Sequence, residues 1–339
     1  MKSLIQKLVE LDGPPGYESA VRQAVRTEIE PLVDQVSADN LGNLIARKGQ
    51  KSNTGLRIMM SAHLDEIGVI ATHVEEAGFV RFLPMGSVRA STCPGGRVRF
   101  LKGARGVIGS ERLSDLSRVP AFEQMYIDVG ATSRQNCPVQ VGDLAVFERP
   151  FLDLGDRLVS KAMDNRINVA ILIEVLRQMN VQSLRSPHEL FFVFSAQEEV
   201  GERGALTAAF AIDPDLGLAL DVTSCGDTPK GLRMEVKLGK GPAIKVRDQG
   251  SISDPRVVRW MVETAEAQRL PYQMEILKQG RTDAGAIQTT RRGVPAGCLS
   301  IPCRYVHTPS EMIDYNDVQN AVKLLIALLR DPINEWIDK

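Results

Sequence analysis

The sequence predicts an α/β fold with a smaller β-rich domain inserted into it, and three observations carry this prediction. Strand-like runs alternate with helical periodicity in residues 1–66 and again in 159–339, which predicts a sheet covered by helices on both faces. Residues 67–158 instead consist of short alternating segments separated by glycine, a pattern typical of a small barrel or sandwich. The length of 339 residues suits two domains. We therefore expect a catalytic domain from 1–66 and 159–339 and an inserted domain from 67–158.

The elements of the larger domain follow from its local patterns. Helical periodicity covers residues 2–11 and 17–33, on either side of the breaker GPPG, and strands are expected at 43–48 and 56–62. After the β-rich block the expected order is helix NRINVAILIEVLRQM, strand ELFFVFSA, helix GALTAAFA, strand LGLALDV, a helix at 254–269, a short helix after Asp283, strand AGCLSI and helix NDVQNAVKLLIALLRD.

Composition limits the class of function. The chain is 43% hydrophobic and 24% charged, as in an ordinary globular protein. Its formal net charge of −1 gives no electrostatic reason to expect nucleic acid or an anionic membrane as a partner. No run approaches the roughly 18 apolar residues that a membrane span needs. The five cysteines form no CxxC pair, and the chain opens as MKSLIQKLVELDG without an apolar leader. We therefore expect a cytoplasmic protein with reduced thiols.

Polar residues occur where the apolar strands end. In open α/β sheets, ligands bind outside the carboxyl ends of the strands, so we expect these side chains to meet at one site. The residues are His63 and Asp65 in MMSAHLDE, Asp164 in SKAMDNRINVA, Glu198 and Glu199 in FVFSAQEE, Asp221 in GLALDVTS, and His307 in CRYVHTPSE.

Two imidazoles and several carboxylates suit divalent ions such as zinc, cobalt or manganese, and the set lacks the thiolates of a closed structural zinc site. Each residue alone has a simpler explanation. A histidine in a buried strand is commonly a core residue, Asp164 before a helix could be an N-cap, and Glu198–Glu199 could be a solvated strand end. As an ordered set they favour a metal site, because clustered carboxylates repel one another unless cations neutralise them. His188 begins no HExxH motif, since residue 192 is Phe.

The same segments resemble a known family of enzymes. SAHLDEIG, KAMDNR, SAQEEVGERGA, ALDVTSCGDTP, RTDAGAIQ and RYVHTPSE are similar, in order and spacing, to the dinuclear metallo-aminopeptidases of the TET or glutamyl-aminopeptidase type, metallopeptidase family 42. The resemblance covers essentially the whole chain, including the place of the insert. Related deacylases and carboxypeptidases usually insert their extra domain after the last acidic ligand. Here the insert lies between Asp65 and Asp164, which favours the TET-like family. The resemblance implies an α/β/α three-layer catalytic domain (phosphorylase/hydrolase-like) with a PDZ-like β-barrel used for dimerisation and assembly.

The resemblance also implies roles for the clustered residues and two divalent ions per subunit, zinc or cobalt. The implied ligands are His63 and Asp221 for one ion, Glu199 and His307 for the other, and Asp164 as the bridge between them. Glu198 would be the general base that activates a metal-bridging water, and Asp65 would orient the His63 imidazole.

The implied activity is the removal of N-terminal residues from short peptides by a homo-oligomer, a tetrahedral dodecamer built from dimers. An endoglucanase-like glycoside hydrolase using two carboxylates is an alternative, but it leaves both histidines without a role, and aromatic residues for sugar stacking make up only 5% of the chain. A related metal-dependent deacylase or carboxypeptidase and a non-catalytic assembly module are further alternatives. Arg281, where relatives often have glycine, could receive an acidic substrate side chain, although a structural charge is the simpler interpretation.

Overall fold

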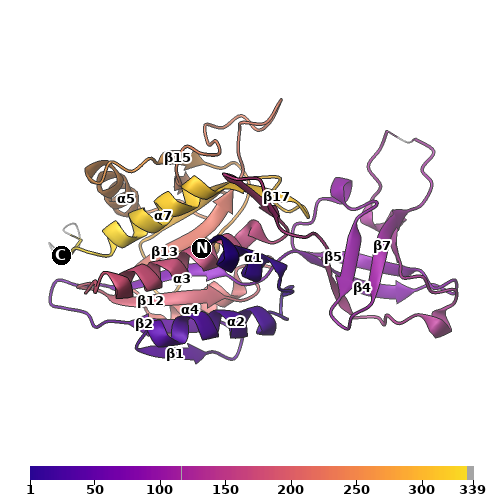
Figure 1. Ribbon diagram of the computed structural model, residues 1–339, viewed down its shortest axis with the longest axis horizontal. Coiled ribbons are helices and arrows are strands. Elements are labelled where there is room, and N and C mark those ends of the chain that lie inside the picture. Colours follow the sequence, from indigo (N-terminus) through magenta and orange to yellow (C-terminus); the bar gives the residue numbers. More distant parts are fainter. Residues whose placement is uncertain (116, 334–339) are drawn as a thin grey trace.

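A mixed sheet forms the centre of the larger domain, and a closed barrel forms the smaller one beside it (Figure 1). This computed structural model describes residues 1–115 and 117–333. The strands of the large sheet, in spatial order, are β1 (Gln35–Ala38), β2 (Leu44–Lys48), β12 (Glu189–Ser195), β3 (Arg57–His63), β13 (Leu216–Thr223), β16 (Ala296–Arg304), β17 (Glu311–Asp314), β11 (Arg157–Ser160) and β10 (Leu152–Asp153). A side branch consists of β14 (Ala243–Arg247), which pairs with β16, and β15 (Gln273–Ile276).

Among the residues that the structure describes, parallel pairing is confined to the centre of this sheet and to the β14–β15 branch. β12 and β13 flank β3, β16 follows β13, and all four run in the same direction. Such strands are buried on both faces and read as nearly continuous apolar runs. Every residue of β13 is buried, for example. The carboxyl ends of the four central strands consequently share one edge of the sheet.

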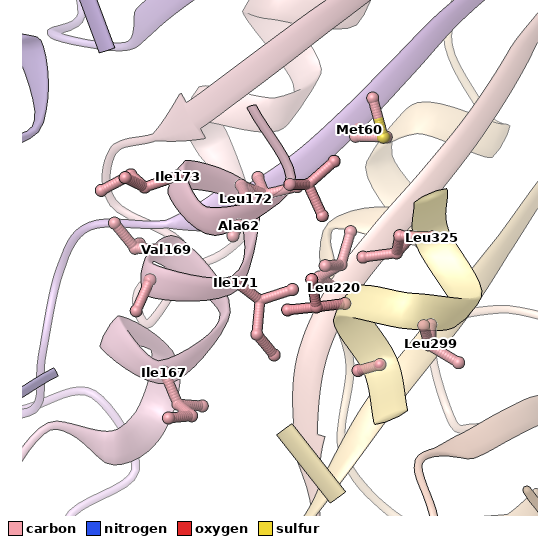
Figure 2. Packing of buried hydrophobic residues seen from close by; sticks show 14 of the residues in the cluster. Met60, Ala62, Ile167, Val169, Ile171, Leu172, Ile173, Leu220, Leu299 and Leu325 are labelled. Atoms are coloured by element: carbon pink, nitrogen blue, oxygen red, sulfur yellow. The ribbon is translucent and has the colours of Figure 1, made fainter. Parts of the chain in front are cut away.

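Helices cover both faces, as the sequence predicts. α1 (Lys2–Glu10), α2 (Ser19–Ile29), α3 (Met163–Val181), α5 (Pro255–Ala267) and α7 (Tyr315–Leu328) share one core, while α4 (Arg203–Ile212) and α6 (Asp283–Gln288) share another. Alternation along β3 divides its side chains between the two, since Met60 and Ala62 enter the first core and Met59 the second. Figure 2 shows the first core, where Ile171 of α3 and Leu325 of α7 lie near Leu220 of β13. No helix in 1–115 or 117–333 is long and apolar enough to cross a membrane.

The helix expected over 17–33 is shorter than predicted. α2 ends at Ile29, and a 3-10 turn, η1, covers Glu30–Leu32. Pro31 explains the difference, because it has no N–H to donate and its ring clashes with the preceding turn of an α-helix.

The inserted domain is a closed antiparallel barrel. Its strands, in order around the barrel, are β4 (Gly68–Val74), β5 (Val80–Met85), β8 (Met125–Asp128), β7 (Arg105–Ser110), β6 (Arg97–Phe100) and β9 (Leu144–Phe147). Short 3-10 turns lie in the described part of its loops: η2 (Ala90–Thr92), η3 (Phe122–Gln124) and η4 (Arg134–Asn136). The last barrel strand ends at Phe147, whereas β10 lies inside the expected range of 67–158 but pairs with β11 of the large sheet. The barrel itself therefore ends earlier than the boundary expected at residue 158.

An ion-pair network joins the barrel to the sheet through a buried pair, Lys161 and Glu66, and a partly exposed pair, Asp12 and Arg99. Lys161 Nζ lies 2.7 Å from both carboxylate oxygens of Glu66, and both side chains are almost fully buried. Lys161 also lies 3.6 Å from Asp12, which binds Arg99 of barrel strand β6 at 2.7 Å. Removing one member of such a pair leaves the other charge buried without compensation.

Lys161→Met is therefore expected to lower the free energy of unfolding by about 3 kcal/mol, because Glu66 loses its main cationic partner. The matched control is Lys2→Met, which removes a partly exposed lysine paired with Asp153 at 3.0 Å and should cost less than about 1 kcal/mol. Urea unfolding at equal protein concentration measures both. Equal losses in the two variants would contradict the importance given to the buried network.

Candidate metal centre

The seven side chains predicted to meet are brought together at the carboxyl edge of the parallel strands. His63 is the last residue of β3 and lies opposite Ser195, the last residue of β12. Glu198 and Glu199 follow β12 directly, Asp221 lies near the end of β13, and the loop after β16 carries His307. The remaining two residues, Asp65 and Asp164, lie just after β3 and at the beginning of α3.

Asp164 lies between the two imidazoles. Its Oδ1 is 3.1 Å from Nε2 of His63, and its Oδ2 is 3.2 Å from Nε2 of His307. The carboxyl group is buried, with 6% of the residue exposed. A carboxylate that presents one oxygen to each of two imidazoles has the arrangement of a ligand shared between two cations.

Each histidine has a further carboxylate of its own. Nε2 of His63 lies 3.8 Å from Asp221 Oδ1, and Nε2 of His307 lies 3.7 Å from Glu199 Oε2. The donor set fits divalent ions, because ligand atoms of His63, Asp164 and Glu199 all lie within 4.8 Å of one another. In addition, Oε1 of Glu199 is buried and has no hydrogen-bond partner among the described residues. A buried carboxylate oxygen needs such a partner or a cation.

Glu198 lies beside His63, at the same separation from its Nε2 as Asp221. Its Oε2 is 3.8 Å from Nε2 of His63, and the described contacts give it no salt bridge to His307. The adjacent glutamates therefore have different surroundings: Glu199 faces His307, and Glu198 faces His63.

Asp65 contacts the backbone of Glu198 and Glu199 as well as His63, the only contact that the sequence analysis assigned to it. Its Oδ1 accepts a hydrogen bond from the Glu198 N–H and its Oδ2 one from the Glu199 N–H, both at 3.0 Å. Nδ1 of His63 lies 3.1 Å from the Asp65 backbone carbonyl and 3.5 Å from its Oδ1. Because a carbonyl only accepts, Nδ1 is the donor in this contact, so a neutral His63 ring would present Nε2, which faces Asp164, as its ligand atom.

Two buried carboxylates near the site were missed by the sequence analysis as functional candidates. Glu311 accepts hydrogen bonds from the backbone N–H groups of Asp164 at 2.9 Å and of His307 at 2.8 Å. Asp283 accepts hydrogen bonds from the hydroxyl groups of Ser61 on β3 and Ser195 on β12. The only signal for either was its place inside the segments RYVHTPSE and RTDAGAIQ.

Burial and mutual repulsion shift the titration of the cluster. Burial, together with neighbouring carboxylates, raises the pKa of Glu199 to about 7 and those of Glu198 and Asp221 well above their usual range. Burial opposes a charge on His307, but Glu199 and Asp164 outweigh it and raise its pKa to about 10. Burial likewise opposes a charge on Asp164, yet the hydrogen bonds with both histidines hold its pKa below the usual range. The cluster thus holds protons where cations could replace them.

Arg281 is already paired. Its Nε lies 2.5 Å and its second guanidinium nitrogen 2.9 Å from the two oxygens of Glu202. Such a bidentate arrangement occupies an edge of the guanidinium, with two N–H groups matched to the two oxygens of a carboxylate. The structural interpretation of this arginine is therefore favoured over binding of an acidic substrate side chain.

Comparison with known proteins agrees with this site and fold. The family model for M42 glutamyl aminopeptidase matches residues 42–324. A putative aminopeptidase of Acetivibrio thermocellus is 44% identical, covering 97% of this chain and 98% of its own. Among solved structures, an aminopeptidase from the archaeon Desulfurococcus kamchatkensis superimposes with a TM-score of 0.93 at 38% identity, covering 99% and 96% of the two chains. A TET1 peptidase of Pyrococcus horikoshii gives a TM-score of 0.88 at 31% identity, with 97% and 99% covered.

These matches extend over nearly the whole chain, barrel included. They confirm the resemblance seen in the six sequence segments, the α/β fold with its inserted barrel, and the enzyme class, an aminopeptidase-type hydrolase. The protein therefore belongs to the M42 glutamyl aminopeptidase family.

Proposed function

We propose that this protein is a dinuclear metal-dependent aminopeptidase that removes N-terminal residues from short peptides. The observation that carries the proposal is the position of Asp164, with one oxygen beside His63 and the other beside His307. Family membership implies divalent metal ions, and we propose two per subunit, zinc or cobalt. His63 and Asp221 would hold one ion, Glu199 and His307 the other, and Asp164 would be shared.

Such ions, when bound, supply Lewis acidity and an activated water as nucleophile. The proposed task of Glu198 is proton transfer: it takes the proton of that water and passes it to the leaving amine. Its side chain is largely buried, and burial raises its pKa well above the usual range, so the carboxylate readily accepts a proton. The backbone N–H groups of Glu198 and Glu199 both donate hydrogen bonds to Asp65. These bonds fix the backbone of the two glutamates, so each side chain can keep a separate role.

We further propose a cytoplasmic homo-oligomer, a tetrahedral dodecamer built from dimers that associate through the barrel. The Pyrococcus horikoshii TET1 peptidase assembles into a tetrahedron or a large octahedral shell, and a related TET1 structure is a dodecamer. In this chain the barrel of residues 68–147 is a separate folded unit with its own core, which supports its use in assembly. The five cysteines, which form no CxxC pair, support the proposed cytoplasmic location.

A glycoside hydrolase is kept as a second candidate for one reason. A Thermotoga maritima protein described as an endoglucanase is 34% identical, with a TM-score of 0.79. Glycosidases of the two-carboxylate type need no metal ion. They would leave the contacts of Asp164 with both imidazoles without a purpose, and the metal-dependent peptidase accounts for them.

Metal removal combined with one substitution tests the proposal. Treatment with EDTA should abolish hydrolysis of aminoacyl chromogenic substrates, and zinc or cobalt should restore it. Glu198→Gln should bind metal as the parent does but remain about 10²–10⁴-fold slower in kcat after metal is restored, because proton transfer is lost. Peptide hydrolysis that survives chelation would contradict the proposal. Hydrolysis of cellulose oligomers that is indifferent to chelators and to Glu199→Ala would instead support the glycosidase.

The pH dependence of stability gives a second test, using protein freed of divalent ions. The pKa of Glu199 is raised from 4.5 to about 7, and that of His307 from 6.5 to about 10. The folded state therefore holds more protons than the unfolded state across this window, so stability should fall as the pH rises from about 5 to 10. The lowered pKa of Asp164 acts in the opposite sense, but only at more acidic pH.

Melting temperatures measured across this range, with and without zinc, check the expectation. Zinc should flatten the decline, because it replaces the protons as the compensating charge. His307→Asn should remove the part of the decline between about pH 7 and 10. A melting temperature that rises with pH in the ion-free protein would contradict the charge arrangement described above.

A further inference from the structure

Glu311 accepts hydrogen bonds from the backbones of two proposed ligand residues, Asp164 and His307, and not from their side chains. Oε2 accepts from the Asp164 N–H at 2.9 Å, and Oε1 accepts from the His307 N–H at 2.8 Å. The residue is 1% exposed, so no solvent competes for these bonds. Because both oxygens accept from N–H groups, one carboxylate links two segments that are 143 residues apart in sequence.

The topology explains why one side chain can reach both. Glu311 is the first residue of β17 and pairs with Ser160, the last residue of β11. The chain that leaves β11 reaches Asp164 within four residues, and the loop that joins β16 to β17 contains His307. Both ligand-bearing segments therefore leave the same pair of strand ends.

His307 also needs such a restraint. Its φ of +61° lies in the left-handed region, which a residue with a side chain adopts only when its surroundings hold it there. The hydrogen bond from its own N–H to Glu311 is one such contact.

We propose that Glu311 is a positioning residue that sets the separation between Asp164 and His307, and thereby the affinity of the ion that these two residues share with Glu199. This rests on the proposed function, since it assumes that the cluster holds two ions. Asp65 bonds the amides of Glu198 and Glu199 in the same manner. Glu311 thus contacts the backbones of the shared ligand Asp164 and of His307, and among the described residues it makes no hydrogen bond with His63 or Asp221.

The chain offers a matched control in Asp317. This buried carboxylate also accepts from two backbone N–H groups, those of Gly239 and Gly241, both at 2.7 Å. Neither glycine is a proposed ligand. Loss of one acceptor by Asp317→Asn should therefore resemble Glu311→Gln in its effect on folding but not in its effect on metal binding.

The experiment is a titration of chelator-treated, full-length protein with Co²⁺. Binding is monitored by calorimetry and by the visible d–d absorption of cobalt. The parent should take up two equivalents. Glu311→Gln should bind one of the two equivalents about 10–100-fold more weakly, with a changed spectrum for that step, while the other equivalent changes much less. Asp317→Asn should titrate as the parent does. If Glu311→Gln does not fold, Glu311→Asp keeps the charge but reaches only one amide, and should show the same selective loss.

The outcomes are distinct. Two parent-like equivalents in Glu311→Gln would overturn the inference and leave the proposed function intact. An equal loss of both equivalents, or a loss also seen in Asp317→Asn, would show a general effect on folding and would overturn it too. A parent that takes up fewer than two equivalents would instead contradict the proposed function.

Discussion

The convergence of ionisable side chains at one edge of a parallel sheet is the constraint on which the rest of the structure depends. β12, β3, β13 and β16 run in the same direction, so the residues that follow them meet whether or not their charges are compatible. Carboxylates gathered in this way are buried and repel one another. Protons, the two imidazoles or cations must compensate them, and this requirement connects the fold to its proposed chemistry.

Backbone amides supply the second half of the arrangement. Asp65 binds the amides of the adjacent glutamates, and Glu311 binds those of Asp164 and His307. Hydrogen bonds from N–H groups stabilise carboxylates without using the side chains that could hold ions. The backbones of the proposed ligands are consequently held by hydrogen bonds while their side chains stay available to an ion. A site needs this arrangement if its geometry is to be set before an ion binds.

The α/β sheet and the seven residues that meet at its edge could be predicted, because both depend on patterns that are visible along the sequence. Apolar runs reveal buried strands, and the polar residue after each run marks the sheet edge. β1, β14, β15 and β17 are short and were not predicted, since they depend on pairing with a partner strand. Glu311 and Asp283 were missed as functional residues for a related reason. Their roles come from contacts with distant backbone or hydroxyl groups, and no local pattern indicates such contacts.

The central claim, that Asp164 is shared by two cations, can be tested most directly by anomalous diffraction from crystals of the zinc-loaded protein. Two zinc peaks are expected roughly 3.5–4 Å apart, the separation usual for two-metal hydrolytic sites, with Asp164 between them. One peak should lie beside His63 and Asp221, and the other beside His307 and Glu199. A single peak, or two peaks that do not both contact Asp164, would contradict it.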